Sequence, residues 1–305
     1  MSDRLKINLC GITFNNPVIA ASGTFGYGIE FARFTDLNKI GGISVKGISL
    51  KETFGNKMPR IAETTAGMLN AIGLQNIGAE RFISEKLPLL KKYNTRIIAN
   101  FWGKTIDEYK ETARILDSSD VDMLEMNISC PNVKEGGITF SSCPEMTEEI
   151  VKVVRKVVTH KPLIVKLSPN VTDIKPFASA CEKHGADAIS LINTLLGMAI
   201  DINTMKPKIA NITGGLSGPA IKPVAIRMVY EAKKAVSIPI IGMGGITFWE
   251  DAAEFFLAGA DAVQVGTANF RDPNVCVTIS EGLNKYLESK NINNISEITG
   301  KVVLS

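Results

Sequence analysis

The chain has 305 residues, of which 45% are hydrophobic and 21% charged, so it can bury a large core. Its formal net charge of +3, with basic residues interleaved among acidic ones, excludes the clustered basic surface of a nucleic-acid-binding protein. No stretch approaches the roughly 18 apolar residues that span a bilayer, and no signal peptide is recognisable. We therefore expect no membrane segment and a cytoplasmic location.

The cysteines and histidines exclude several kinds of site. Five cysteines are scattered without a CxxC pair, and only two histidines accompany them, so no disulfide framework, iron–sulfur cluster or zinc site is expected. We predict no metal on this chain. Cys10, Cys181 and Cys276 lie in apolar or helical patterns and are expected to be core residues.

In chain order, a short hairpin over residues 6–9 and 12–14 precedes a regular alternation of strands and helices. Eight apolar runs of strand length follow, at residues 18–21, 42–45, 96–101, 123–126, 163–167, 188–192, 240–242 and 262–265. Helical patterns separate them, among others at residues 77–91, 106–116, 146–158, 174–183, 220–235 and 249–257.

This alternation predicts an α/β fold with a parallel sheet, because continuously apolar strands are buried on both faces. Eight such units, in a chain modestly longer than the ~250 residues typical of one (β/α)₈ TIM barrel, favour that fold over an open doubly wound sheet. We predict a single domain over residues 1–305, with an N-terminal β-hairpin and inserted loops at the C-terminal face. The longest insertions fall between residues 46 and 78 and between residues 193 and 219.

The residues that follow the predicted strands are unusually polar, and in such a barrel the active site lies at the carboxyl ends of the strands. They are Ser22, Lys46, Asn100, Asn127, Lys166 and Asn193. Gly244 and Gly245 follow the seventh strand, and Gly266 and Thr267 follow the eighth, where backbone N–H groups commonly bind phosphate. The glycine-rich residues 214–219 offer another anion-binding turn.

A phosphate-bearing mononucleotide such as FMN fits these strand ends. No GxGxxG sequence opens a first βα unit, so a dinucleotide site of the Rossmann type is unsupported. In an FMN site, Lys166 is expected beside the pyrimidine edge of the flavin, where its charge would stabilise the reduced form.

Cys130 is the strongest candidate for acid–base chemistry. It follows a strand end in a polar loop, and Pro131 holds it extended. A thiol can accept a proton near neutral pH if cations such as Lys46 and Lys166 lower its pKa. The glycines at residues 136–137 predict a hinged lid over the substrate. Nucleophilic catalysis stays open, although no histidine lies nearby in sequence.

Nine segments of the chain, in order, resemble dihydroorotate dehydrogenases, and most closely the class 1B catalytic subunits. They are IAASGTFG, SVKGISL, NAIGLQN, NISCPNVKEGG, IVKLSPNVTDI, LINTLLGMAID, GGLSGPAIKP, GMGGI and QVGTANF. The resemblance implies oxidation of (S)-dihydroorotate to orotate in pyrimidine (UMP) biosynthesis, with one FMN per chain as hydride acceptor and Cys130 as general base.

The resemblance also implies the binding residues. Dihydroorotate or orotate would be held by Lys46, Asn70, Ala71, Ile72, Gly73, Leu74, Asn127, Asn193 and Thr194. FMN would be held by Ser22, Lys46, Gly47, Asn100, Asn127, Lys166, Ile192, Gly218, Gly244, Gly245, Gly266 and Thr267.

The implied class decides the partner. A class 1B chain is expected to form a homodimer core within a heterotetramer, whose second subunit carries FAD and a 2Fe-2S cluster and passes electrons to NAD⁺. A class 1A homodimer that reduces fumarate stays open, because it also uses a cysteine base. Two further alternatives are a dihydropyrimidine dehydrogenase-like enzyme and, from a different class, a non-redox phosphate-binding barrel subunit.

Overall fold

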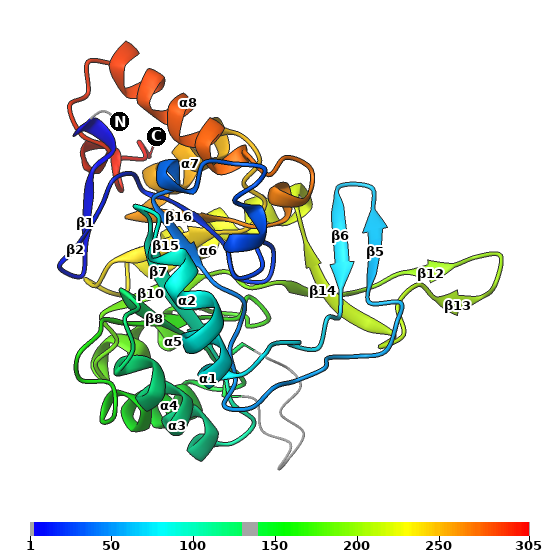
Figure 1. Ribbon diagram of the computed structural model, residues 1–305. Helices are drawn as coiled ribbons and strands as arrows, with labels where there is room; N and C mark the ends of the chain where they lie inside the picture. Colours follow the sequence, from blue (N-terminus) through cyan, green and yellow to red (C-terminus); the bar gives the residue numbers. More distant parts are fainter. Residues whose placement is uncertain (1–2, 130–139, 305) are drawn as a thin grey trace.

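The computed structural model describes residues 3–129 and 140–304, and it contains a closed parallel barrel (Figure 1). Each strand pairs with its neighbours in the sequence order of the barrel strands, and the last pairs with the first. The strands are β3 (Val18–Ala20), β4 (Gly42–Ser44), β7 (Arg96–Phe101), β8 (Met123–Asn127), β9 (Leu163–Lys166), β10 (Ala188–Leu191), β15 (Ile240–Met243) and β16 (Ala262–Val265). The predicted (β/α)₈ barrel is confirmed.

Helices connect the strands and cover the outside of the barrel (Figure 1). The main ones are α3 (Ile106–Asp117), α4 (Pro144–Arg155), α5 (Lys175–Lys183), α6 (Lys222–Lys233), α7 (Trp249–Ala258) and α8 (Val275–Ser289). The helix expected over residues 77–91 is divided into α1 (Ala79–Arg81), a π-helical segment (Phe82–Lys86) and α2 (Leu87–Leu90). Within the described residues, no helix is both long and apolar enough to cross a bilayer.

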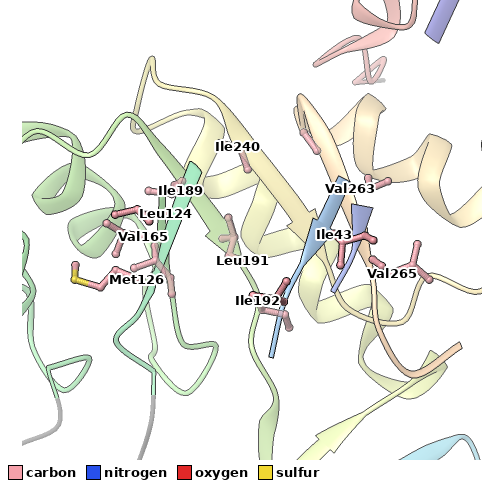
Figure 2. Close-up of a cluster of buried hydrophobic side chains, with 14 of the residues drawn as sticks. Ile43, Leu124, Met126, Val165, Ile189, Leu191, Ile192, Ile240, Val263 and Val265 are labelled. Atoms are coloured by element: carbon pink, nitrogen blue, oxygen red, sulfur yellow. The ribbon is translucent and has the colours of Figure 1, made fainter. Parts of the chain in front are cut away.

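The outward-facing side chains of the barrel strands form the larger part of the core. Figure 2 shows Leu124, Met126, Val165, Ile189 and Val263 in this layer, and all of them are fully buried. Alternate residues of the same strands point into the barrel, because successive side chains of a strand face opposite sides. The strands are therefore buried on both sides, as is typical of a parallel sheet.

The inward-facing residues near the amino ends of the strands form a separate apolar cluster, which the N-terminal hairpin closes. Its buried members are Leu9, Phe14, Ile19, Ile98, Met123, Ile164, Ala188, Ile241 and Ala262. The hairpin consists of β1 (Ile7–Leu9) and β2 (Ile12–Phe14), as predicted. The Phe14 ring packs so closely on β4 that a Cβ atom at Gly42 would lie 2.9 Å from it.

Phe14→Ala is expected to reduce the free energy of unfolding by about 3–5 kcal/mol, because it leaves a cavity among side chains that cannot collapse to fill it. Chemical denaturation measures the change, and Thr13→Ala, at an exposed position of the same strand, serves as the control. A loss in Phe14→Ala no larger than that in Thr13→Ala would show that the hairpin does not contribute to the barrel core.

The two long insertions pair with each other in a second sheet, which stands to one side of the barrel (Figure 1). Its strand order is β11 (Leu195–Met198), β14 (Thr213–Ser217), β6 (Gly67–Asn70) and β5 (Ile61–Thr64). A smaller hairpin, β12 (Ile200–Asp201) with β13 (Lys206–Pro207), extends from it. The sequence predicted only loops here, and β6 meets β14 with Asn70 opposite Gly215.

Candidate active site

Towards the carboxyl ends of the strands, the inward-facing side chains change from apolar to polar. The residues of this polar layer are Ser44, Asn100, Glu125, Lys166, Ser190 and Gln264, none of them more than 5% exposed. Asn100 and Lys166 were predicted from their positions at strand ends. The other four lie within the apolar runs, and the carboxylate in the sequence MLEMN is the signal that could have revealed them.

Glu125 lies at the centre of this polar layer. Its Oε2 accepts hydrogen bonds from Ser44 Oγ at 2.8 Å and Asn100 Nδ2 at 2.6 Å. Its Oε1 accepts from Ser190 Oγ at 2.8 Å and Gln264 Nε2 at 2.7 Å. Burial alone would raise the pKa of Glu125, but the charge of Lys166 and the hydrogen bonds outweigh it and hold the pKa below its usual range. The carboxylate is therefore ionised at neutral pH.

Two lysines at the carboxyl ends of the strands are in direct contact with no anionic group among the described residues, although Lys166 interacts electrostatically with Glu125. Lys166 is 5% exposed and Lys46 is half-buried, and neither ammonium group makes a hydrogen bond or ion pair with residues 3–129 or 140–304. Burial, followed by the charge of Arg60, lowers the pKa of Lys46. A buried cation without a partner is costly, so this arrangement favours the binding of an anion or an electron-rich ring.

Asn127 and Asn193 meet through Ser129, which the sequence analysis did not single out. Asn127 Oδ1 accepts from Ser129 Oγ at 2.6 Å and from Asn193 Nδ2 at 3.4 Å, and Asn193 Nδ2 also donates to Ser129 Oγ. The Tyr109 hydroxyl donates to the Asn127 carbonyl at 2.7 Å and holds the end of β8. Thr194 N–H donates to Asn193 Oδ1 at 2.8 Å, so three predicted substrate-binding residues form one cluster.

The predicted substrate-binding residues 70–74 run from the second sheet to the end of β4. Asn70 Nδ2 donates to the Gly215 carbonyl at 3.3 Å, and Ala71 N–H donates to the Arg60 carbonyl at 2.7 Å. Asn56 N–H donates to the Ile72 carbonyl at 3.0 Å. Gly73 and Leu74 have φ values of 74° and 55°, and this turn brings Leu74 beside Gly47: a Cβ atom at Gly47 would lie 4.0 Å from Leu74 Cδ2.

The glycines that follow β14, β15 and β16 lie together. Gly218 and Gly245 have φ values of 102° and 79°, and a Cβ atom at Gly245 would lie 2.7 Å from Lys222 Cβ and 3.0 Å from the Gly218 carbonyl. Thr267 Oγ1 donates to Ser217 Oγ at 2.8 Å, which connects the end of β14 to the turn after β16. The N–H of Gly245 has no acceptor among the described residues. These turns, with Gly218, Gly245 and the residues 266–267, are called the glycine cradle below. Such an arrangement can accept a phosphate.

The remaining predicted cofactor-binding residues border this cradle. Ile192 is 2% exposed, and a Cβ atom at Gly244 would lie 3.2 Å from its Cγ1. A Cβ atom at Gly266 would lie 3.9 Å from the side chain of Ala21, the residue before Ser22. The structure thus brings the predicted strand-end residues and the glycines to one face of the barrel.

Cys130 lies outside the described residues, as does the predicted hinge at residues 136–137, and Ser129 is the last described residue before them. Among the other cysteines, burial raises the pKa of Cys10 and Cys276 to about 12 and raises that of Cys181 further. These thiols are protonated at neutral pH. Cys181 and Cys276 are buried core residues as expected, whereas Cys10 lies in the hairpin turn and is only partly buried.

Comparison with known proteins identifies the family. The family model for dihydroorotate dehydrogenase matches residues 4–287. Proteins named dihydroorotate dehydrogenase B (NAD(+)), catalytic subunit, are similar over 98% of this chain: that of Alkaliphilus metalliredigens is 55% identical and covered to 98%, and that of Geotalea uraniireducens 57% and also 98%. That of Pelobacter propionicus is 56% identical and covered to 99%. The family consists of flavin enzymes, and this chain belongs to the dihydroorotate dehydrogenase family.

Proposed function

We propose that this chain oxidises (S)-dihydroorotate to orotate with a bound FMN, as the NAD⁺-linked catalytic subunit of the class 1B enzyme in pyrimidine biosynthesis. One observation carries the proposal. In a chain of this family, two lysines whose ammonium groups make no hydrogen bond among the described residues, an amide cluster and a glycine cradle converge at the carboxyl ends of one parallel barrel. That set suits an anionic substrate and a phosphate-bearing cofactor.

The residues present fit FMN. The glycine cradle would take the phosphate, because its turns leave no room for side chains and Gly245 N–H lacks an acceptor among the described residues. Lys166 would lie beside the electron-rich edge of the ring, and the Asn100 oxygen would accept a hydrogen bond from it. Ser22, Lys46, Gly47, Asn127 and Ile192 would complete the site. FMN supplies the acceptor for the hydride that leaves the substrate.

The chain's own residues would orient the substrate and take its proton. Lys46 would pair with the carboxylate of dihydroorotate, and Asn127 and Asn193, held by Ser129, would hydrogen-bond to the polar edge of its ring. Residues 70–74 and Thr194 would enclose it. Cys130 would accept the proton from the ring carbon next to the one that loses hydride, so that the substrate loses H⁺ and H⁻ in total and gains a double bond.

The proposal is tested by reconstituting the purified chain with FMN and adding substrate without oxygen. We expect a yellow protein whose absorbance bleaches rapidly with dihydroorotate and much less with dihydrouracil, which has no carboxylate for Lys46. Bleaching by dihydrouracil alone would favour a dihydropyrimidine dehydrogenase-like activity. A chain that takes up no flavin would point to a non-redox phosphate-binding barrel.

Gly245→Ala is expected to weaken FMN binding at least about tenfold, or about 1.4 kcal/mol, because its Cβ would collide with Lys222 and close the cradle. Fluorescence titration of the cofactor-free chain with FMN measures the dissociation constant. Gly300→Ala is the matched control, since Gly300 also has a positive φ (70°) but no neighbour within 4 Å of a Cβ atom. Equal effects of the two substitutions would exclude a phosphate at the cradle.

The proposed electron exit is a partner subunit that carries FAD and a 2Fe-2S cluster, around a homodimer of this chain. Support comes from the relatives, whose names include NAD(+) and the words catalytic subunit. Affinity purification from the native host, followed by metal and flavin analysis, tests for the partner. Rapid fumarate reduction by the isolated chain would favour the class 1A alternative instead.

A further inference from the structure

The carboxylate of Glu125 takes no part in the proposed reaction, although it lies directly beneath the proposed flavin site. It is 0% exposed and receives hydrogen bonds from four other barrel strands, through Ser44, Asn100, Ser190 and Gln264. Burying a carboxylate costs several kcal/mol unless hydrogen bonds and an opposite charge compensate it. A buried carboxylate also acts electrostatically on the charged and polar groups around it.

Two of the groups that Glu125 acts on are the ones proposed to face the flavin. Asn100 donates its NH₂ group to Glu125 at 2.6 Å, so its oxygen is turned away, towards Gly47: a Cβ atom there would lie 3.0 Å from Asn100 Oδ1. Lys166, on the adjacent strand β9, interacts electrostatically with Glu125 and has no other anionic partner among the described residues. Glu125 therefore orients one group and balances the charge of the other.

We propose that Glu125 is a positioning residue that lowers the reduction potential of the bound flavin through Lys166 and Asn100. A reduced flavin carries additional negative charge, which Lys166 stabilises and a carboxylate behind Lys166 opposes. A lower potential favours transfer of the electrons to an acceptor of low potential, such as the NAD⁺ in the names of the relatives. The inference rests on the proposed FMN site, and it explains why a charged carboxylate is buried at Glu125.

The test is a spectroscopic redox titration of the FMN-loaded chain at pH 6.5. In Glu125→Gln, reduced FMN is expected to bind at least tenfold more tightly relative to oxidised FMN than in the wild type. That ratio corresponds to an upward shift of about 30 mV for a two-electron couple. Glu125→Asp keeps the charge and is expected to shift the potential less.

Ser190→Ala is the matched control for a purely structural role, because it removes one hydrogen bond to Glu125 and leaves the charge in place. It is expected to lower the melting temperature without changing the potential. If Glu125→Gln does not fold, the double exchange Glu125→Gln with Gln264→Glu keeps a carboxylate–amide pair and moves its carboxylate from β8 to β16. This exchange is expected to raise the potential by a smaller amount.

The outcomes separate this inference from the proposed function. An unchanged or lowered potential in the folded variants, or an equal shift in Ser190→Ala, would overturn the role of Glu125 and leave the FMN site intact. A wild-type chain that binds no FMN would overturn both proposals.

Discussion

Replacing Cys130 by alanine is expected to slow reduction of the flavin by dihydroorotate about 10²–10⁴-fold, the usual contribution of a positioned general base. FMN should stay bound, because the proposed cofactor contacts come from the strand ends and the glycine cradle. Anaerobic stopped-flow absorbance on the FMN-loaded chain measures the rate, and the resting spectrum shows whether the cofactor is retained.

Cys276→Ala provides the comparison, because Cys276 is 1% exposed and its raised pKa keeps the thiol protonated. Its rate of flavin reduction should equal that of the wild type. A Cys130→Ala variant as fast as Cys276→Ala would remove Cys130 from the proposed mechanism. Loss of the yellow colour in Cys130→Ala would mean that the residue serves the cofactor and not the substrate.

Replacing Lys46 by methionine is expected to change stability and function in opposite directions. The cofactor-free chain should become more stable by on the order of 1 kcal/mol, because an ammonium group without an anionic partner among the described residues is removed. Flavin reduction by low concentrations of dihydroorotate should slow about 10²–10³-fold, because the substrate carboxylate and the flavin lose a fixed positive charge. Denaturation and stopped-flow measurements on one preparation test both effects.

The pH dependence gives this prediction a second test. The pKa of Lys46 in the folded chain lies below the ordinary value of 10.5, so the charged lysine opposes folding at neutral pH. The difference in the free energy of unfolding between Lys46→Met and the wild type should have its largest value at neutral pH, where Lys46 is charged in both the folded and the unfolded chain. It should shrink as the pH rises through the lowered pKa towards 10.5.

Lys233→Met is the control for Lys46→Met. Lys233 forms an ion pair with Asp261 at 3.3 Å, so its removal should cost a little stability and leave flavin reduction unchanged. A destabilised Lys46→Met variant with normal reduction kinetics would show that Lys46 has a structural role only.

The barrel and most of the polar residues at its C-terminal face could be predicted from the sequence, because a parallel barrel places the carboxyl ends of all its strands on one face. Knowing where the apolar runs stop was therefore sufficient to find Lys46, Asn100, Lys166 and Asn193. Ser129 was not found, since a serine two residues beyond a strand is common in any loop. Its contacts with Asn127 and Asn193 depend on the distance between β8 and β10.

Two other features could not be predicted for physical reasons. Ser190 and Gln264 lie within short apolar runs, where a single polar residue does not reveal which face it occupies or what it contacts. Helix α8 begins with Val275, Cys276 and Val277, and β-branched residues there are as typical of a strand as of a buried helix.

The pairing of β6 with β14 has a consequence for how the site forms during synthesis. Asn70 and Gly215 hydrogen-bond across 145 residues of chain, so this contact can form only after the barrel strands β7 to β10, which lie between them, have been synthesised. A chain emerging from the ribosome has made residues 70–74 long before their supporting strand exists. The segment proposed to enclose the substrate therefore gains its supporting strand β14 only after residue 217 has been synthesised.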